Sequence, residues 1–520
     1  MNRSRINLHG NKSDLCSGKT DSTSVMLEAT RFTDLNSLKR SCMLPRIFLT
    51  LILPACVLLP TVISSEAQAE TTELQAGAAA IDITPPVGTS LDGVISKNGP
   101  VTGVHDRIFS RALVLADGDT RIAICVNDLC MVERSYFDRA KKIVFEKTGL
   151  PVDRILMTST HTHAAPRVPY GRATEQDDVY YEQLVEQMAA AIIQAEQNLA
   201  PAQIAWGSFD AGKYAACRRF LAEKGSVSIN PFGVAGEQIK SVAGQSKSII
   251  QPAAPVDPQC SLLSVQHRDG TPLAILGNMS IHYCGGYQKG QISADYFGAY
   301  TRHLAKKQTT ENSHPPFVGM LSNGTSGNVG AVMKQDKKKY AAFEWIEEAG
   351  KQFAEQSLKV IDQLDHQSDW NINMIEQELE LGIRRPDAAR LRWARDILEH
   401  PQQKTPHRWS KIYATEAVEL SKYPPTEKIK IQAIRIGELG IVGLPCEVFT
   451  ETGLAIKDQS PFKATFSMEL ANGSSGYLPT PAQHALGGYE TWPARSSYLE
   501  IDAETKIRQT ALKLLNQLHD

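Results

Sequence analysis

The sequence has almost no excess charge and few cysteines. Its 55 Lys and Arg residues nearly balance 57 Asp and Glu residues, so the formal net charge is -2. Without a basic field to attract a polyanion, we expect no nucleic-acid partner. The nine cysteines include no CxxC pair and are too sparse for a disulfide scaffold, although one or two bridges are compatible with an oxidising compartment.

Internal repeats, low-complexity tracts and long charged runs are also absent from Leu74 onward. The hydrophobic content of 42% and the charged content of 22% are ordinary for a globular protein. We therefore expect residues 75–520 to form a single large α/β domain, with mixed β-sheets flanked by helices.

Residues 1–69 have the pattern of an N-terminal extension followed by a signal peptide. Basic residues precede an apolar run from Ile47 to Ile63, and Ala67-Gln68-Ala69 supplies the small residues that a signal peptidase accepts. One alternative is a transmembrane anchor, but the apolar run is short for a membrane span and contains two prolines. The other is lipid attachment at Cys56, which is disfavoured because the apolar run continues beyond this residue. The pattern predicts export to the periplasm, the cell surface or the medium.

Hydrophobic periodicity and turn residues predict the main elements of the domain. Asp-Gly steps at 117–118 and 269–270 predict hairpins. Residues 76–86 predict an edge strand, because the closing proline pair cannot donate to a ladder. Segments 222–258 and 401–428 predict long loops of the kind that flank functional sites. Predicted helices span residues 133–147, 180–197, 294–306, 340–364, 387–400 and 503–518.

Three segments that lie far apart in the sequence each predict a strand that ends at a candidate metal ligand. Strands at 154–160, 272–276 and 429–444, the last with an internal turn, run on to His161-Thr162-His163, His282 and Glu447 respectively. Strand ends that open into loops are where α/β proteins build their sites. Imidazoles with a carboxylate, and one position left for water, are the ligands of a catalytic zinc.

Each of these candidates has a structural alternative. His161 and His163 project from one face of an extended segment roughly 7 Å apart, and one could bind a metal while the other moves protons. An HxH pair also occurs on exposed strands, but the polar run that begins at Thr158 favours a pocket. His282 alone suits a hydrogen-bonded core, and Glu447 suits a helix cap.

Glycines flank two tyrosines, Tyr477 and Tyr489, in segments 471–480 and 487–490. Such glycines favour backbone packed closely around a ligand. A phenol can ligate a metal as phenolate or donate a hydrogen bond to an oxyanion. The alternative is a glycine-rich surface loop with aromatic anchors.

Taken in order, these motifs resemble the N-terminal catalytic region of the neutral/alkaline non-lysosomal ceramidases, which are zinc amidases that cleave the N-acyl bond of ceramide. The resemblance extends from about Ala76 to Tyr489. It is carried by Ala76-Gly77 with Ile81-Asp82-Ile83-Thr84-Pro85-Pro86, by Gly103-Val104-His105-Asp106 with Arg111-Ala112, by Thr160-His161-Thr162-His163, and by the strand that ends at His282.

The resemblance implies a zinc-dependent amidohydrolase with one Zn²⁺ per chain, which cleaves a ceramide-like or related N-acyl substrate through zinc-activated water. The implied zinc ligands are His161, His282, Glu447 and Tyr477, with His163 as acid/base, and with Tyr489 and Arg218 at the oxyanion. Arg219 is an alternative to Arg218, because the two are adjacent. Expected partners are a small-molecule or lipid N-acyl substrate, and peripheral contact with a membrane is compatible with a lipid.

Two departures from the family pattern keep other hypotheses open. The family's Gly-Asp-Val-Ser-Pro-Asn loop is replaced by residues 327–332, which lack both the aspartate and the serine. The sequence also leaves no room after Tyr489 for the family's immunoglobulin-like C-terminal domain. The alternatives are an exported binding protein that keeps the fold and metal without catalysis, an esterase or amidase for non-lipid substrates, and a structural metal with a closed ligand shell.

Overall fold

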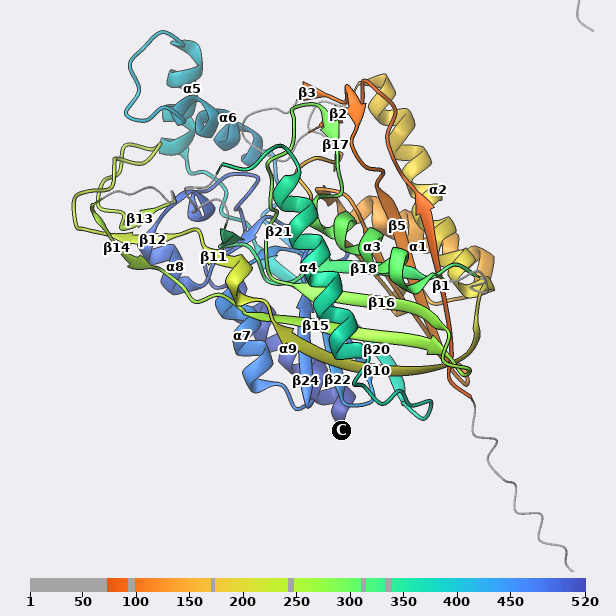
Figure 1. Ribbon diagram of the computed structural model, residues 1–520. Coiled ribbons are helices and arrows are strands. Elements are labelled where there is room, and N and C mark those ends of the chain that lie inside the picture. Colours follow the sequence, from red (N-terminus) through yellow and green to blue (C-terminus); the bar gives the residue numbers. More distant parts are fainter. Residues whose placement is uncertain (1–72, 92–98, 170–173, 242–246, 310–314, 333–338) are drawn as a thin grey trace, which may run out of the picture. The chain divides into compact units, whose positions relative to one another are not determined.

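Two β-sheets pack face to face between layers of helices (Figure 1). The larger sheet has the strand order β18-β16-β15-β10-β1-β5-β6-β8, and the smaller has the order β20-β21-β22-β24. Leu113 and Ile204 of the larger sheet and Ile434 and Phe466 of the smaller are buried in one core between them. This computed structural model describes residues 73–91, 99–169, 174–241, 247–309, 315–332 and 339–520, so the expected signal segment 1–69 lies outside the described residues.

The larger sheet contains both predicted hairpins, β5–β6 and β15–β16, as antiparallel pairs. Only β6–β8 and β16–β18 are parallel among its pairs of described strands. The prediction of an edge strand at 76–86 is wrong, because β1 lies between β5 and β10 and the prolines follow its end at Asp82. The strands are β1 (Gln75–Asp82), β5 (Phe109–Asp117), β6 (Thr120–Asn127), β8 (Ile155–Ser159), β10 (Ala200–Asp210), β15 (Gln259–His267), β16 (Pro272–Met279) and β18 (Val318–Asn323).

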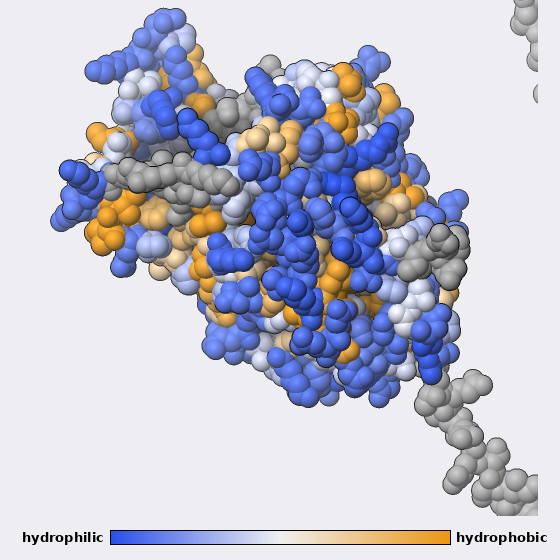
Figure 2. All heavy atoms as spheres, viewed as in Figure 1, coloured by the Kyte–Doolittle hydropathy of each residue, from blue (hydrophilic) through white to orange (hydrophobic). Residues whose placement is uncertain are grey.

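Helices α1 (Arg134–Thr148), α2 (Glu175–Gln197), α3 (Asp295–Gln308) and α4 (Glu344–Ile361) cover the outer face of the larger sheet. Hydrophilic atoms cover the solvent side of α4 in Figure 2. The predicted helices are confirmed with shifted ends, and α2 starts before Tyr180 because Thr174 and Asp177 form a capping box. No helix within the described part of the chain is long and apolar enough to span a membrane.

The smaller sheet consists of β20 (Ile372–Gly382), β21 (Thr426–Ile436), β22 (Leu439–Gly443) and β24 (Ala464–Met468). The turn predicted within 429–444 is confirmed, and Gly437 occupies it with a left-handed φ of 55°. Helices α7 (Thr450–Gln459) and α9 (Ala503–His519) pack on its outer face through residues such as Ile456 and Leu515.

The two predicted long loops contain regular structure. Segment 222–258 includes β13 (Ile239–Lys240) and β14 (Ile249–Pro252), which pair with β12 (Phe220–Ala222). The loop prediction for 401–428 is wrong, because α6 (Ser410–Leu420) forms there and buries Ala414 and Ala417 against α5 (Ala388–Glu399). The remaining short elements are β2 (Ser90–Leu91), β3 (Gly99–Pro100), β4 (Gly103–Val104), β7 (Met131–Val132), β9 (Arg167–Val168), β11 (Ala215–Cys217), β17 (Gln291–Ile292), β19 (Val329–Ala331), β23 (Glu447–Val448), β25 (Tyr477–Leu478) and α8 (Pro481–Leu486).

The ends of the larger sheet come together although β18 and β8 are its terminal strands in hydrogen-bonding order. Asn323, the last residue of β18, donates from Nδ2 to Thr160 O and to His282 O, at 3.3 Å each. The loops that follow β8 and β16 therefore lie side by side. This convergence brings the histidine segments at 161–163 and 282 to one place.

Candidate metal centre

His161 follows β8 and has its backbone in the left-handed region, with φ of 66°. Its backbone N–H donates to Leu129 O at 3.0 Å, and its Nδ1 lies 2.7 Å from Cys130 O. A carbonyl oxygen only accepts, so this contact places the ring proton on Nδ1 and leaves the lone pair of Nε2 facing the site. Because a non-glycine residue in this conformation costs about 1–3 kcal/mol, the surrounding contacts must hold it.

His282 and Glu447 meet His161 at its Nε2 atom. The Nε2 atoms of His161 and His282 are 2.9 Å apart, and Glu447 Oε2 lies 3.3 Å from the first and 3.7 Å from the second. All three residues are buried, and together they form a group that could hold a metal ion. Tetrahedral ligands at about 2.0–2.1 Å from one ion lie about 3.3–3.4 Å from each other, so the three donors fit a zinc-sized ion.

Tyr477 reaches the same cluster through backbone pairing. Glu447 of β23 and Tyr477 of β25 are opposite each other in a short parallel pair, and the phenol hydrogen-bonds to the Glu447 carboxylate. The helix-cap alternative for Glu447 does not hold, because α7 has Phe449 at its N-cap and no side-chain cap. Burial and the neighbouring carboxylate both raise the pKa of the Tyr477 phenol.

The electrostatics of the cluster favour a positive charge between these groups. Burial is the largest single influence on the pKa of His161 and lowers it, but the Glu447 carboxylate and Cys130 together raise this pKa well above its usual value. Burial raises the pKa of Glu447, but His161, Arg218 and the Tyr477 hydroxyl together hold it below its usual value. The carboxylate is therefore ionised in this buried place and stabilises a cation at the imidazole edge.

His163 lies beside the three-residue group rather than within it. Its Nε2 is 3.1 Å from His161 Nε2, and its ring stacks on Tyr283 with centroids 3.8 Å apart. Both histidines of the HxH pair are buried, at 1% and 5% exposure, which excludes an exposed strand as their setting. An imidazole in this position can exchange a proton with a molecule held by the cluster.

The two adjacent arginines face different surroundings. Arg218 donates from Nη2 to Gly327 O at 2.6 Å and lies 3.2 Å from Tyr477 Oη. Its guanidinium carbon is also 5.5 Å and 5.8 Å from the ring centroids of Tyr477 and Tyr489. Arg219 is fully buried and pairs with Glu490. The structure thus brings Arg218, and not Arg219, to the two tyrosines.

Sequence reasoning missed Ser326 and Glu469, which lie behind His282. Ser326 Oγ is 3.4 Å from His282 Nδ1 and donates to Glu469 Oε1. Glu469 is fully buried, and burial raises its pKa to about 7. Glu469 directly follows β24, so the signal that identified Glu447, a carboxylate at the end of a buried strand, could have found it as well.

Two further features of the cluster were not predicted. Cys130, His161 and His163 form a second group of buried ligand types, which shares His161 with the first. At Gly327, the first residue of the segment that replaces the family loop, a Cβ atom would lie 2.4 Å from Glu447 O. The loop therefore packs directly against the backbone of Glu447, and only glycine fits there.

The family comparison agrees with the motifs and the fold. A model described as "Neutral/alkaline non-lysosomal ceramidase, N-terminal" matches residues 74–342. The chain belongs to this ceramidase family. Membership implies a hydrolase that acts on the amide bond of a lipid substrate of the sphingolipid class.

Solved structures show that the ceramidase fold extends beyond the matched segment. A neutral ceramidase from Pseudomonas aeruginosa matches with a TM-score of 0.63 and 16% identity, over 86% of this chain and 74% of that one. A structure titled "Ceramidase complexed with C2" matches with a TM-score of 0.65 and 16% identity, over 86% and 75%. The α/β architecture predicted from the sequence is confirmed by this likeness.

Proposed function

We propose that this ceramidase-family chain is a zinc-dependent hydrolase that cleaves the N-acyl bond of a ceramide-like lipid. The supporting observation is that His161, His282 and Glu447, from three distant segments, place their ligand atoms within 3.7 Å of one another in a buried cluster. Tyr477 completes a set of four ligands around one ion per chain. Family membership supports the amide and lipid parts of the proposal.

A zinc ion held there would polarise the amide carbonyl and lower the pKa of a water molecule from about 16 towards 7. The protein supplies the orientation of the donors. Cys130 O fixes the ring of His161, and Ser326 Oγ lies against Nδ1 of His282. Contacts of this kind set the tautomer and direction of histidine ligands.

His163 is the proposed acid/base. Stacking on Tyr283 sets the plane of its ring, and its Nε2 faces the cluster. It would accept a proton from the attacking water and pass it to the leaving nitrogen, a contribution of about 100- to 10,000-fold.

Arg218 and Tyr489 are the proposed donors to the oxyanion. Arg218 is held by Gly327 O on one side of the cluster, and the Tyr489 ring lies 5.8 Å from the Tyr477 ring, edge to face. Burial raises the pKa of the Tyr489 phenol, so it stays protonated and can donate. Loss of one such donor costs about 3 kcal/mol in the transition state.

Hydrolysis assays on the purified protein test this proposal. We expect release of fatty acid from short- and long-chain N-acylsphingosines, loss of this activity on treatment with a chelator, and recovery with one equivalent of Zn²⁺. Cleavage of simple amides or esters in place of the lipid would favour the non-lipid alternative. Protein that binds zinc and hydrolyses none of these compounds would favour the binding-protein hypothesis.

We also propose that the chain is exported and that residues 1–69 are removed. The basic, apolar and small-residue order of that segment supports it. N-terminal sequencing of the mature protein tests it. An N-terminus after Ala69 is expected, and a mature protein that retains the apolar run from Ile47 to Ile63 would contradict cleavage.

A further inference from the structure

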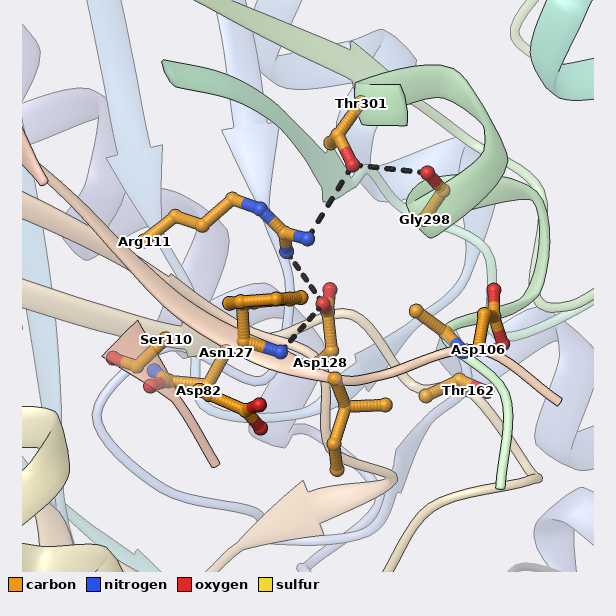
Figure 3. Close-up of polar contacts among 12 residues, drawn as sticks. Asp82, Asp106, Ser110, Arg111, Asn127, Asp128, Thr162, Gly298 and Thr301 are labelled. Carbon is orange, nitrogen blue, oxygen red and sulfur yellow. Dashed lines mark hydrogen bonds and ion pairs between the residues drawn. The ribbon is translucent and has the colours of Figure 1, made fainter. Parts of the chain in front are cut away.

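A buried ion pair between Arg111 and Asp128 lies next to the loop that holds His161. Arg111 is on β5 and Asp128 follows β6, and they are 6% and 1% exposed. In Figure 3 the Arg111 guanidinium points to Asp128, whose Oδ2 accepts from Arg111 Nη1 and from the backbone N–H of Phe109. Arg111 belongs to a motif of the sequence for which the proposed chemistry has no use.

The two residues that follow Asp128 make the contacts that fix His161. Leu129 O accepts the backbone N–H of His161 at 3.0 Å, and Cys130 O lies 2.7 Å from its Nδ1. Asp128 itself is tied to the sheet through its N–H, which donates to Phe109 O at 3.0 Å. The left-handed conformation of His161 therefore depends on a loop whose first residue is anchored by Arg111.

The second terminal nitrogen of the Arg111 guanidinium connects this loop to the segment that carries His282. Arg111 Nη2 donates to Thr301 Oγ1 of α3 at 3.3 Å, as Figure 3 shows. Asp295, the first residue of the same helix, accepts the backbone N–H groups of Cys284 and Gly285 at 3.1 and 3.0 Å. Arg111 thus contacts Asp128, which begins the loop that holds His161, and helix α3, which holds the segment after His282.

The ion pair is poorly explained as a source of stability. Burying two charges costs several kcal/mol per ion, and well-packed apolar residues often replace such pairs without loss. Asp128 Oδ1 is buried with no hydrogen-bond partner among the described residues, which adds to this cost. A pair kept at such a cost suits a role in fixing geometry.

We infer that Arg111 and Asp128 are positioning residues, which hold the loop at 128–130 so that His161 directs Nε2 at the metal. This inference rests on the proposed metal centre, but the support of His161 can be tested in the metal-free protein. Neither residue touches the ligand atoms, so both act through the carbonyl oxygens of Leu129 and Cys130.

The test uses the double variant Arg111→Met/Asp128→Asn, which removes both charges and keeps an acceptor for the Phe109 N–H. In metal-free protein with ¹⁵N-labelled histidine, the His161 Nδ1–H resonance should shift or broaden relative to wild type. Zinc affinity, measured by competition with a chelator, should fall about 10- to 100-fold, as for other contacts behind metal-bound histidines. Arg139→Met, which removes the exposed Arg139–Glu182 pair of α1 and α2, is the matched control and should behave as wild type.

Unchanged His161 resonances and unchanged zinc affinity in a folded double variant would overturn the inference. Arg111→Lys is the milder variant in case the double variant does not fold. It keeps the charge but cannot donate to Asp128 and Thr301 together, so a smaller loss of affinity and a smaller shift are expected, and wild-type values would overturn the inference. A wild-type protein that binds no zinc would defeat the proposed function, while the metal-free resonance would still decide the support of His161.

Discussion

Glu447 and Tyr477 are directly opposite each other in the two-residue parallel pair β23–β25. Backbone pairing therefore brings the carboxylate and the phenol together, and the strand pair itself does not depend on the tyrosine hydroxyl. The segment between them contains α7 and β24, so the strand pair closes a long connection beside the histidines. Side-chain substitutions at Tyr477 can thus test the site without disrupting the strand pair.

Tyr477→Phe should lower zinc affinity about tenfold or more while the protein stays folded. The variant loses the hydroxyl that contacts Glu447 and Arg218 but keeps the strand pair and the ring. A chelator competition titration measures the change. Tyr489→Phe is the matched control, and it should bind zinc normally but turn over about 100- to 1,000-fold more slowly. Equal zinc affinity in wild type and Tyr477→Phe would remove Tyr477 from the ligand set.

The three histidines should separate into two classes. His161→Ala and His282→Ala should each abolish stoichiometric zinc together with turnover, since each removes an Nε2 donor from the group that includes Glu447. His163→Gln should retain zinc, while turnover falls about 100- to 10,000-fold. Metal analysis of the dialysed proteins and steady-state rates provide the data. Full zinc content in His282→Ala, or normal turnover in His163→Gln, would contradict these roles.

Arg218 and Arg219 should differ in what their loss affects. Arg218→Lys should fold normally and reduce kcat, because lysine keeps the positive charge near Glu490 but cannot reproduce the guanidinium contacts with Gly327 O and Tyr477 Oη together. Arg219→Met should destabilise the protein by about 3–5 kcal/mol, because it removes a fully buried guanidinium that pairs closely with Glu490 and donates to Gly487 O, and it leaves Glu490 only the more distant Arg218, 3.8 Å away. Urea unfolding and initial rates distinguish the two effects. A stable, slow Arg219→Met variant beside an active Arg218→Lys variant would reverse the assignment.

Lys141 should make stability depend on pH above neutrality. Burial lowers the pKa of this lysine from 10.5 to about 7 in the folded state, where its Nζ donates to Asn472 Oδ1 at 2.7 Å. Between these values the unfolded chain binds a proton that the folded protein releases, so the free energy of unfolding rises as pH increases from 7 towards 10.5. The raised pKa of Glu469, about 7, acts with the opposite sign and only below that pH.

Lys141→Met should remove this rise. The variant should gain most stability relative to wild type near pH 7, and the gain should shrink at higher pH as wild-type Lys141 loses its proton. Urea unfolding of both proteins at several pH values from 7 to 9 measures the difference. A gain that stays constant across this range would show that Lys141 does not titrate there.

The sequence predicted the parts of the site that depend on local pattern. His161, His282 and Glu447 each follow an apolar strand, and period-2 and turn signals locate such strands well. Hydrophobic periodicity alone could not show that β18 and β8 approach each other, because this approach depends on the pairing of strands that are distant in sequence. The meeting of the three ligands was therefore a hypothesis until the fold was known.

Other features were missed for identifiable reasons. Helix α6 lies in a segment flanked by Pro and polar residues, and its burial comes from contact with neighbours that the sequence does not reveal, such as Phe232 against Tyr413. Ser326 has no pattern of its own, because its position against His282 and Glu469 follows from tertiary packing. The prolines after β1 suggested an edge strand, but they lie beyond Asp82, the last residue that pairs with β5. The sequence does not show where this pairing ends.

The most direct measurement is an anomalous difference map from crystals of the purified protein, recorded at the zinc absorption edge. We expect a single strong peak per chain, about 2.0–2.2 Å from His161 Nε2, His282 Nε2 and a Glu447 carboxylate oxygen. A peak at another place, or an active protein whose map has no peak at these three residues, would rule out this metal centre.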